Sequence, residues 1–190
     1  MILTKPELLR RIETGHIVAD PNDVQENSIN FRLGTDMFVD RQVVGTINPY
    51  AARKFGKLKP GLDRDGYFWV LDPGRLYIGT TADAIGTRLL GDDVAIVPEC
   101  RARSTTGRHG LTVALCAGVG DVGYAGRWAL EIVNNNHLPI ILRPGTMIGQ
   151  MIFHYATPTD TAYGGSERYQ KDDGSVQFLP RPYPLSEVTR

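Results

Sequence analysis

The sequence predicts a mainly β protein that forms one domain over residues 1–190. Short runs of alternating or β-branched residues recur along the chain, separated by turns rich in Gly, Pro and Asn, which is typical of consecutive strands. The 21 glycines and 12 prolines are dispersed without a period, as in proteins with many tight turns. The length suits a single hydrophobic core and is too short for two ordinary domains.

The first expected element is a helix near the N-terminus. Thr4 and Glu7 have the spacing of a capping box, and Gly15 would end the helix. The apolar face of this helix would consist of Leu8, Leu9 and Ile12.

Strands are expected to follow. Residues 28–34 alternate polar and apolar, which predicts a strand with Ile29, Phe31 and Leu33 turned inward. Residues 40–66 lose this pattern and are predicted to form a long surface excursion. The remaining strands are expected at residues 67–71, 75–80, 94–97, 111–115, 128–133 and 139–142, the first two forming a hairpin around a turn at 72–74.

The C-terminal residues differ in character. Residues 155–190 are polar, rich in Pro, Gly, Tyr and charge, and lack apolar periodicity. We therefore expect an arm that cannot fold alone and that lies on a neighbouring subunit or a ligand.

Charge and hydropathy limit the classes of function. Basic and acidic residues number 21 each, so no overall field favours binding to nucleic acid or a membrane, and we expect neither as a partner. No apolar run approaches the roughly 20 residues of a membrane span, and the first residues lack the long apolar region of a signal peptide. We expect a soluble, cytoplasmic protein. Any bound anion would require a local cluster.

Cysteine and histidine offer no metal site. Cys100 and Cys116 belong to no C-x-x-C pair and are predicted to be small buried hydrophobes. The four histidines are scattered, and no pair of them has the spacing of metal ligands on one helix or strand.

Two segments have residues suited to binding a ligand. Residues 103–108 place two arginines around three hydroxyls and a glycine, which suits an anion such as phosphate, although a strand-to-helix cap with solvated arginines explains the same residues. Residues 117–126 hold four glycines around Asp121. They suit either the close approach of a flat ligand or an ordinary tight hairpin.

Glu131 is the third candidate, because it interrupts the apolar strand predicted at residues 128–133. A buried carboxylate at this position would have a raised pKa and would suit a proton shuttle near neutral pH. The alternative is an outward-facing Glu on a half-exposed strand.

Taken together, these motifs resemble the deoxycytidine triphosphate (dCTP) deaminases, within the trimeric deoxyuridine triphosphatase (dUTPase) superfamily. The resemblance covers nearly the whole chain and includes ILTKPELLRRIETGHI, SINFRLG, RSTTGRHGL, AGVGDVGYAG, ALEIVN, LPIILRPGTMIGQMIF and AYGGSERYQ. It implies a distorted β-barrel or jelly-roll-like subunit with an N-terminal helix. It also implies a homotrimer with active sites between subunits and a C-terminal arm, residues 155–190, that folds over the nucleotide.

The resemblance further implies hydrolytic deamination of a deoxycytidine nucleotide, with Glu131 as general base and acid. Mg²⁺ would be bound through the nucleotide phosphates. Zinc would not be used, and the chain lacks the H-x-E and P-C-x-x-C signature of zinc deaminases. The residues implied for catalysis are Glu131, Ser104, Arg108 and the carbonyl group of Ala117. Those implied for substrate binding are Arg103, Thr105, Asp121, Tyr124, Tyr163, Arg168 and Tyr169.

Departures from the family leave alternatives open. Residues 118–121 resemble the bifunctional dCTP deaminase/dUTP diphosphatases more than the deaminase-only members, so Asp121 would also activate water at the α-phosphorus and give dUMP and pyrophosphate. Gly120 replaces the usual Ile and would loosen the loop. Asp172 stands where a phosphate-contacting Gln is expected, which leaves a dCMP-type deaminase or a non-catalytic nucleotide-sensing trimer as further alternatives.

Overall fold

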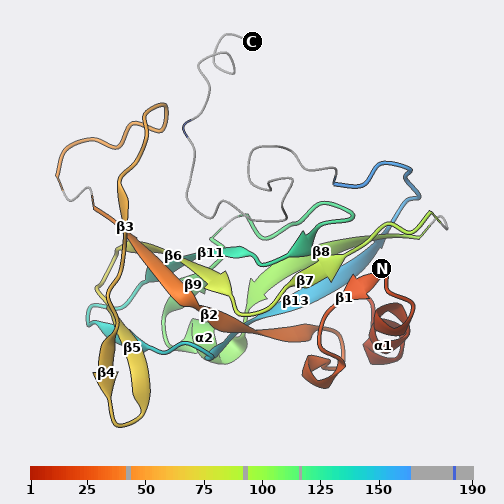
Figure 1. The fold of residues 1–190 in the computed structure, drawn as a ribbon, viewed down its shortest axis with the longest axis horizontal. Helices are drawn as coiled ribbons and strands as arrows, with labels where there is room; N and C mark the ends of the chain where they lie inside the picture. Colours follow the sequence, from red (N-terminus) through yellow and green to blue (C-terminus); the bar gives the residue numbers. More distant parts are fainter. Residues whose placement is uncertain (42–43, 92–93, 116, 164–181, 183–190) are drawn as a thin grey trace.

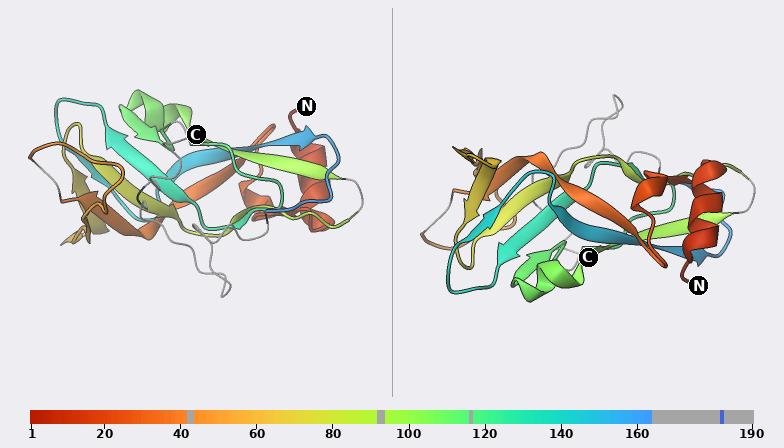
Figure 2. Two further views of the ribbon diagram at one scale, coloured as in Figure 1. Left: turned by 90° about the horizontal axis from the view of Figure 1, so that it is seen from above. Right: turned by 90° about the horizontal axis from the view of Figure 1, so that it is seen from below.

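The computed structural model describes residues 1–41, 44–91, 94–115, 117–163 and 182. In Figures 1 and 2 the N-terminal helix lies at one end of the molecule and a two-stranded hairpin projects at the other. The elements in chain order are α1 (Lys5–Glu13), β1 (Ile17–Val18), the 3₁₀ helix η1 (Pro21–Asp23), β2 (Ile29–Asp40), β3 (Phe55–Lys57), β4 (Gly61–Asp63), β5 (Gly66–Leu71), β6 (Leu76–Thr81), β7 (Ile85–Thr87), β8 (Ala95–Ala102), α2 (Ser104–Arg108), β9 (Leu111–Val113), β10 (Ala125–Gly126), β11 (Ala129–Asn134), β12 (Ile140–Leu142) and β13 (Met147–Ala156).

The main sheet has seven strands in the order β8-β13-β2-β6-β11-β9, with β3 added beside β2, and its ladders are antiparallel. The two outer strands of this order, β8 and β9, lie near one another, so the sheet curls into a nearly closed barrel. Two smaller sheets, β1-β7-β10 and β12-β5-β4, extend its ends. The prediction of a mainly β, barrel-like fold with an N-terminal helix is therefore confirmed.

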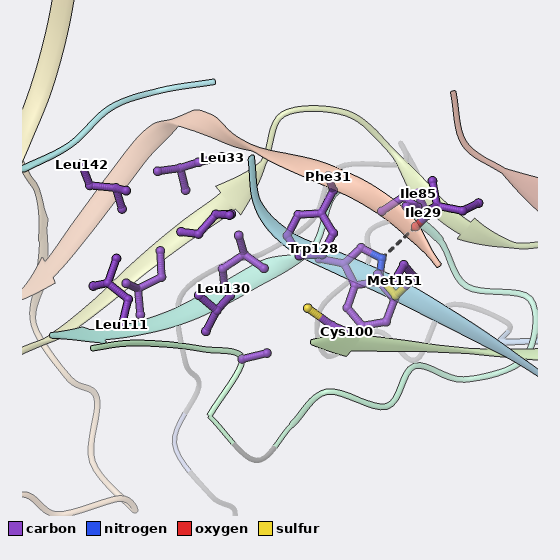
Figure 3. Packing of buried hydrophobic residues seen from close by; sticks show 14 of the residues in the cluster. Ile29, Phe31, Leu33, Ile85, Cys100, Leu111, Trp128, Leu130, Leu142 and Met151 are labelled. Atoms are coloured by element: carbon purple, nitrogen blue, oxygen red, sulfur yellow. Dashed lines mark hydrogen bonds between the residues drawn. The ribbon is translucent and has the colours of Figure 1, made fainter. Parts of the chain in front are cut away.

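The core fills the inside of this barrel (Figure 3). Ile29, Phe31 and Leu33 are buried as predicted for β2, but the strict alternation is not observed, because Asn30 between them is buried as well. Cys100 is buried among them, and burial raises the pKa of its thiol to about 12, as suits a structural cysteine. Cys116 lies outside the described residues.

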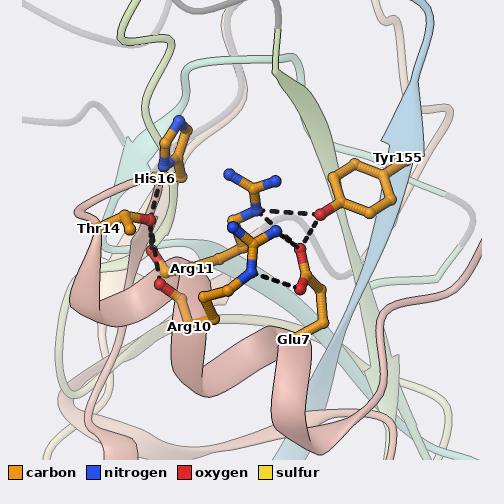
Figure 4. Close-up of polar contacts among 6 residues, drawn as sticks. All are labelled: Glu7, Arg10, Arg11, Thr14, His16 and Tyr155. Atoms are coloured by element: carbon orange, nitrogen blue, oxygen red, sulfur yellow. Dashed lines mark hydrogen bonds and ion pairs between the residues drawn. The ribbon is translucent and has the colours of Figure 1, made fainter.

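Helix α1 differs from its predicted form at one residue pair. Gly15 ends the helix with a φ of +80°, as expected, but the side chain of Thr4 makes no capping hydrogen bond. Glu7 instead binds Arg10 and Arg11 on its own helix and accepts a hydrogen bond from the hydroxyl of Tyr155 on β13 (Figure 4). The predicted capping box is wrong because these cations and the phenol compete for the same carboxylate. Of the predicted apolar face, Leu8 is buried, Ile12 is half-buried and Leu9 is exposed.

The predicted hairpin of residues 67–71 and 75–80 is also wrong. Both segments are strands, but β5 pairs with β4 and β12, whereas β6 pairs with β2 and β11. All residues of β6 after Leu76 are buried, and a strand buried in this way lies between two others in the main sheet. The excursion predicted at residues 40–66 is likewise shorter than expected, since it contains β3 and β4.

Residues 117–126 form no hairpin. The amide of Gly120 donates to Pro98 (2.8 Å), the amide of Cys100 donates to Gly118 (2.6 Å), and β10 pairs with β7. The loop therefore binds strands distant in sequence and does not fold back on itself. The C-terminal arm was predicted from residue 155, but β13 continues to Ala156, so the arm begins after that residue.

None of the helices in the described part of the chain is long and apolar enough to cross a membrane.

Candidate active site

Helix α2 presents the cluster predicted at residues 103–108. It follows directly from β8, with Arg103 as its N-cap residue. Thr106 is buried and its hydroxyl donates to the carbonyl of Ile148 on β13 (2.8 Å), which fixes the short helix to the sheet. Ser104 and Arg108 are left exposed. The segment is thus a strand-to-helix junction, and it also presents free hydroxyls and guanidinium groups to a ligand.

A cavity of about 640 Å³ lies beside α2. Arg103, Thr105 and Arg108 line one part of it, and residues 136–143 of the turn before β12 and of β12 itself line another. Arginines beside threonine hydroxyls provide the donors that phosphate oxygens require. Residues 138–142 of the lining are apolar, and apolar neighbours lower the local dielectric constant and strengthen such contacts.

Glu131 lies on the outer face of β11. Its neighbours Leu130 and Ile132 are fully buried in the core, so the period of the strand turns Glu131 the other way. Although it faces outward, the side chain is half-buried, and this burial raises the pKa of its carboxyl group. Both alternatives for this residue are therefore correct in part, because it faces away from the core and yet is desolvated enough to hold a proton more tightly than an exposed glutamate.

The loop of residues 117–126 leads from the end of β9 towards β11. Ala117 and Asp121 are exposed on it and available to a ligand. Gly120 packs against the indole of Trp128, and a Cβ atom placed on Gly120 would lie 2.4 Å from the ring. The expectation that Gly120 loosens the loop is therefore wrong, because the indole occupies the space of the missing side chain.

Tyr124 and Tyr163, both predicted in the site, are brought together by the fold. The ring of Tyr124 makes edge-to-face contacts with Trp128 (centroids 5.2 Å apart) and with Tyr163 (5.3 Å). Its hydroxyl donates to the carbonyl of Arg127 (2.8 Å). Burial raises the pKa of Tyr124 to about 12, so this hydroxyl stays protonated near neutral pH.

The other predicted residues divide between two parts of the chain. Those on and before α2 are Arg103, Ser104, Thr105 and Arg108, and those of the loop, β11 and the start of the arm are Ala117, Asp121, Tyr124, Glu131 and Tyr163. Among the described residues, no hydrogen bond or ion pair joins Glu131 to Ser104 or Arg108. Arg168 and Tyr169 lie outside the described residues.

Two features of the site were not predicted from the sequence. The indole of Trp128 packs against Gly120 of the loop, and its Nε1 donates to the carbonyl of Ile85 (2.8 Å). A tryptophan directly after a glycine-rich segment was the signal in the sequence. His137, in the Asn-rich turn after β11, lines the cavity beside α2.

No three His, Cys, Asp or Glu side chains of the described ranges are grouped so that they could hold a metal ion.

Comparison with known proteins adds the family context. A family model described as dCTP deaminase-like matches residues 2–156. A protein of Haloarcula marismortui named dCTP deaminase is 30% identical over 184 residues, covering 92% of each chain. A protein of Salinispora tropica named "dCTP deaminase, dUMP-forming" is 34% identical over 183 residues, again covering 92% of each.

A solved structure has a similar fold. The crystal structure of 2'-deoxycytidine 5'-triphosphate deaminase from Agrobacterium tumefaciens superposes with a TM-score of 0.57 at 20% sequence identity. The match covers 82% of this chain and 48% of that one, so the chain spans about half the length of the solved protein.

Proposed function

The chain belongs to the dCTP deaminase-like family, and from this premise we propose that it hydrolyses the amino group of a deoxycytidine nucleotide, converting dCTP and water to dUTP and ammonia. The observation that carries the proposal is the environment of Glu131. A half-buried carboxylate whose pKa is raised by burial can accept and return a proton near neutral pH.

The proposed reaction requires two protons to be relayed, and one carboxylate can take up and release both. Glu131 takes a proton from water as the oxygen attacks C4 of cytosine, and passes that proton to N3. The hydroxyl group now on C4 gives its proton through Glu131 to the amino group. The C4–N bond then breaks, ammonia leaves, and the C4 carbonyl of uracil forms. In this proposal water is activated by the carboxylate and no zinc takes part.

We propose that α2 of a neighbouring subunit completes the site. Ser104 and Arg108 are exposed on α2, and within the described part of their own chain no hydrogen bond or ion pair joins them to Glu131. A homotrimer would bring α2 of one subunit to the loop and β11 of the next, so that Ser104 and the carbonyl of Ala117 hold the water and Arg108 stabilises the developing charge.

The proposed phosphate subsite lies at the cavity beside α2. Arg103 and Thr105 line this cavity and would bind the phosphates. Mg²⁺ would enter as part of the nucleotide, bound to its phosphate oxygens. Asp121 would accept a hydrogen bond from the 3′-hydroxyl of the sugar, with Tyr124 beside the ring, and Arg168 and Tyr169 of the arm would contact the nucleotide.

A second candidate is a bifunctional enzyme that releases dUMP and pyrophosphate. The observation that favours it is that relatives such as that of Salinispora tropica are named dUMP-forming. Asp121 is exposed on the loop and would activate the second water, which attacks the α-phosphorus. Asp121→Asn would then stop pyrophosphate release and leave ammonia release in place.

Incubation with dCTP and Mg²⁺, with the products identified by mass, tests both candidates. Ammonia with dUTP supports deamination alone, and ammonia with dUMP and pyrophosphate supports the bifunctional enzyme. A parallel incubation with dCMP tests a dCMP-type deaminase. Tight nucleotide binding without product in any incubation would reject catalysis in favour of a nucleotide-sensing trimer.

A further inference from the structure

The first residues of the C-terminal arm are docked on the loop of residues 117–126. The amide of Tyr163 donates a hydrogen bond to the carbonyl of Val122 (2.7 Å). The ring of Tyr163 stands nearly perpendicular to that of Tyr124, with an interplanar angle of 84°. A backbone hydrogen bond and an aromatic contact therefore join this residue to the loop.

Gly123 makes this close approach possible. A Cβ atom at Gly123 would lie 2.8 Å from Cβ of Ala162 and 3.2 Å from the amide nitrogen of Tyr163. The φ of Gly123 is also +86°, which other residues adopt only with strain. Both the shape and the backbone of the loop are thus matched to the arm at this position.

The opposite side of the loop is held by the core. The carbonyl of Tyr124 accepts a hydrogen bond from the amide of Thr87 (2.7 Å), and the hydroxyl of Thr87 accepts one from the amide of Gly123 (3.1 Å). The Tyr124 ring also packs on Trp128, which is buried. The loop is therefore held by β7 and the Trp128 indole as well as by Tyr163 of the arm.

From this arrangement we infer that Tyr163 is a positioning residue, which holds the Asp121 loop in its binding conformation through the Tyr124 ring. The inference rests on the proposed function in that the loop binds the sugar of the nucleotide. It changes the role expected for Tyr163, which was direct contact with sugar and phosphates. The amide of Tyr124 donates to the carbonyl of Asp121 (3.1 Å), so a displacement of Tyr124 reaches Asp121 within one turn.

The inference separates binding from chemistry. Glu131 is fixed by the ladders of β11 with β6 and β9, whereas Tyr163 binds Val122 and Tyr124 of the loop. Loss of the Tyr163 ring should therefore act first on residues 121–124 and weaken nucleotide binding more than it slows the proton transfers. In kinetic terms the rise in KM should exceed any fall in kcat.

The kinetic test compares Tyr163→Ala with Tyr163→Phe. Tyr163→Ala should raise KM for dCTP roughly fivefold, in line with the loss of one aromatic pair, and leave kcat within about twofold. Tyr163→Phe keeps the ring and should resemble the parent. Tyr67→Ala is a matched control, since this tyrosine is exposed on β5. An unchanged KM in Tyr163→Ala would overturn the inference, as would a Tyr163→Phe variant as impaired as Tyr163→Ala.

A second test does not depend on catalysis by the protein. Hydrogen exchange of the peptide covering residues 117–127, measured without nucleotide, should be several-fold faster in Tyr163→Ala than in the parent, Tyr163→Phe or Tyr67→Ala. Exchange that is the same in all four proteins would reject this role of Tyr163. If the parent releases no ammonia, the proposed function fails, while this measurement still decides whether Tyr163 orders the loop.

Discussion

Gly120 and Trp128 are complementary in shape. A Cβ atom on Gly120 would lie 2.4 Å from Cη2 and 2.9 Å from Cζ2 of the Trp128 indole, and 3.1 Å from Pro98. The indole is buried and is held in place by the hydrogen bond that its Nε1 donates to the carbonyl of Ile85 (2.8 Å). The glycine therefore allows a large side chain to fill the space beneath the loop that carries Asp121.

This relationship predicts a strong coupling between the two positions. Gly120→Ala should lower the free energy of unfolding by about 1–3 kcal/mol, because the added methyl group overlaps the indole. In a Trp128→Leu background the same change should cost almost nothing, since the smaller side chain leaves room. Urea denaturation of the parent, both single variants and the double variant measures the coupling. An equal cost of Gly120→Ala in both backgrounds would show that the contact does not limit residue 120.

A second prediction concerns Glu7 on α1, which binds Tyr155 near the end of β13. Its hydrogen bond to Arg10 lowers the pKa of its carboxyl group from the ordinary 4.5, and it also binds Arg11 and Tyr155. A lowered pKa means that the contribution to stability is present above pH 4.5 and is lost as the pH falls through the lowered value. Glu7→Gln should therefore destabilise the protein by about 1 kcal/mol at pH 7.

Thermal denaturation between pH 3 and pH 7 measures this effect. The difference between Glu7→Gln and the parent should shrink as the pH falls below 4.5, the ordinary carboxyl value. Glu13→Gln, which changes an exposed carboxylate at the end of the same helix, is the control and should alter stability by no more than about 0.5 kcal/mol. If the Glu7 variant is as stable as the parent at pH 7, the contacts of Glu7 with Arg10, Arg11 and Tyr155 do not stabilise the fold.

The sequence predicted features that depend on local periodicity. Alternation identified the inward apolar residues of β2. The same period places Glu131 on one face of β11 and its neighbours Leu130 and Ile132 on the other. The position of the helix α1 and its end at Gly15 followed from turn chemistry and from apolar residues at helical spacing.

Features that depend on distant contacts were not predictable in this way. The turn at residues 72–74 suggested that β5 and β6 pair, yet burial on both faces places β6 between β2 and β11. Four glycines suggested a hairpin at residues 117–126, although three of them, Gly118, Gly120 and Gly123, allow the close approach of β8, Trp128 and the arm. Local propensity gives strands and turns, whereas strand partners are set by which faces can be buried.

A third prediction concerns Glu131 and follows from the direction of its pKa shift. Glu131→Gln should reduce ammonia release by about 10²–10⁴-fold and leave nucleotide binding measurable, because the amide cannot shuttle protons. Val133→Thr, a change on the same face of β11, is the control and should retain activity. Retained turnover in Glu131→Gln would remove Glu131 from the proposed role.

The same variant predicts a dependence of stability on pH. Burial raises the pKa of Glu131, so the folded protein binds more protons than the unfolded chain between the ordinary and the raised value. The parent therefore loses stability as the pH rises through this window. Glu131→Gln lacks this titration, so its melting temperature relative to that of the parent should increase from pH 4 to pH 8. A constant difference over this range would mean that Glu131 is not desolvated in solution.

The last prediction tests whether α2 and Glu131 of one site come from different subunits. Arg108→Ala and Glu131→Gln should each be inactive alone. Coexpressed in equal amounts and purified through two different tags, they should form mixed trimers in which about one third of the sites take an intact α2 from one chain and an intact Glu131 from the other. Ammonia release per site should recover to about that fraction of the parent value. Coexpression of Arg108→Ala with the double variant Arg108→Ala/Glu131→Gln is the control, since no chain then supplies an intact α2. Absence of recovery in mixed trimers purified through two different tags would place the whole site within one subunit.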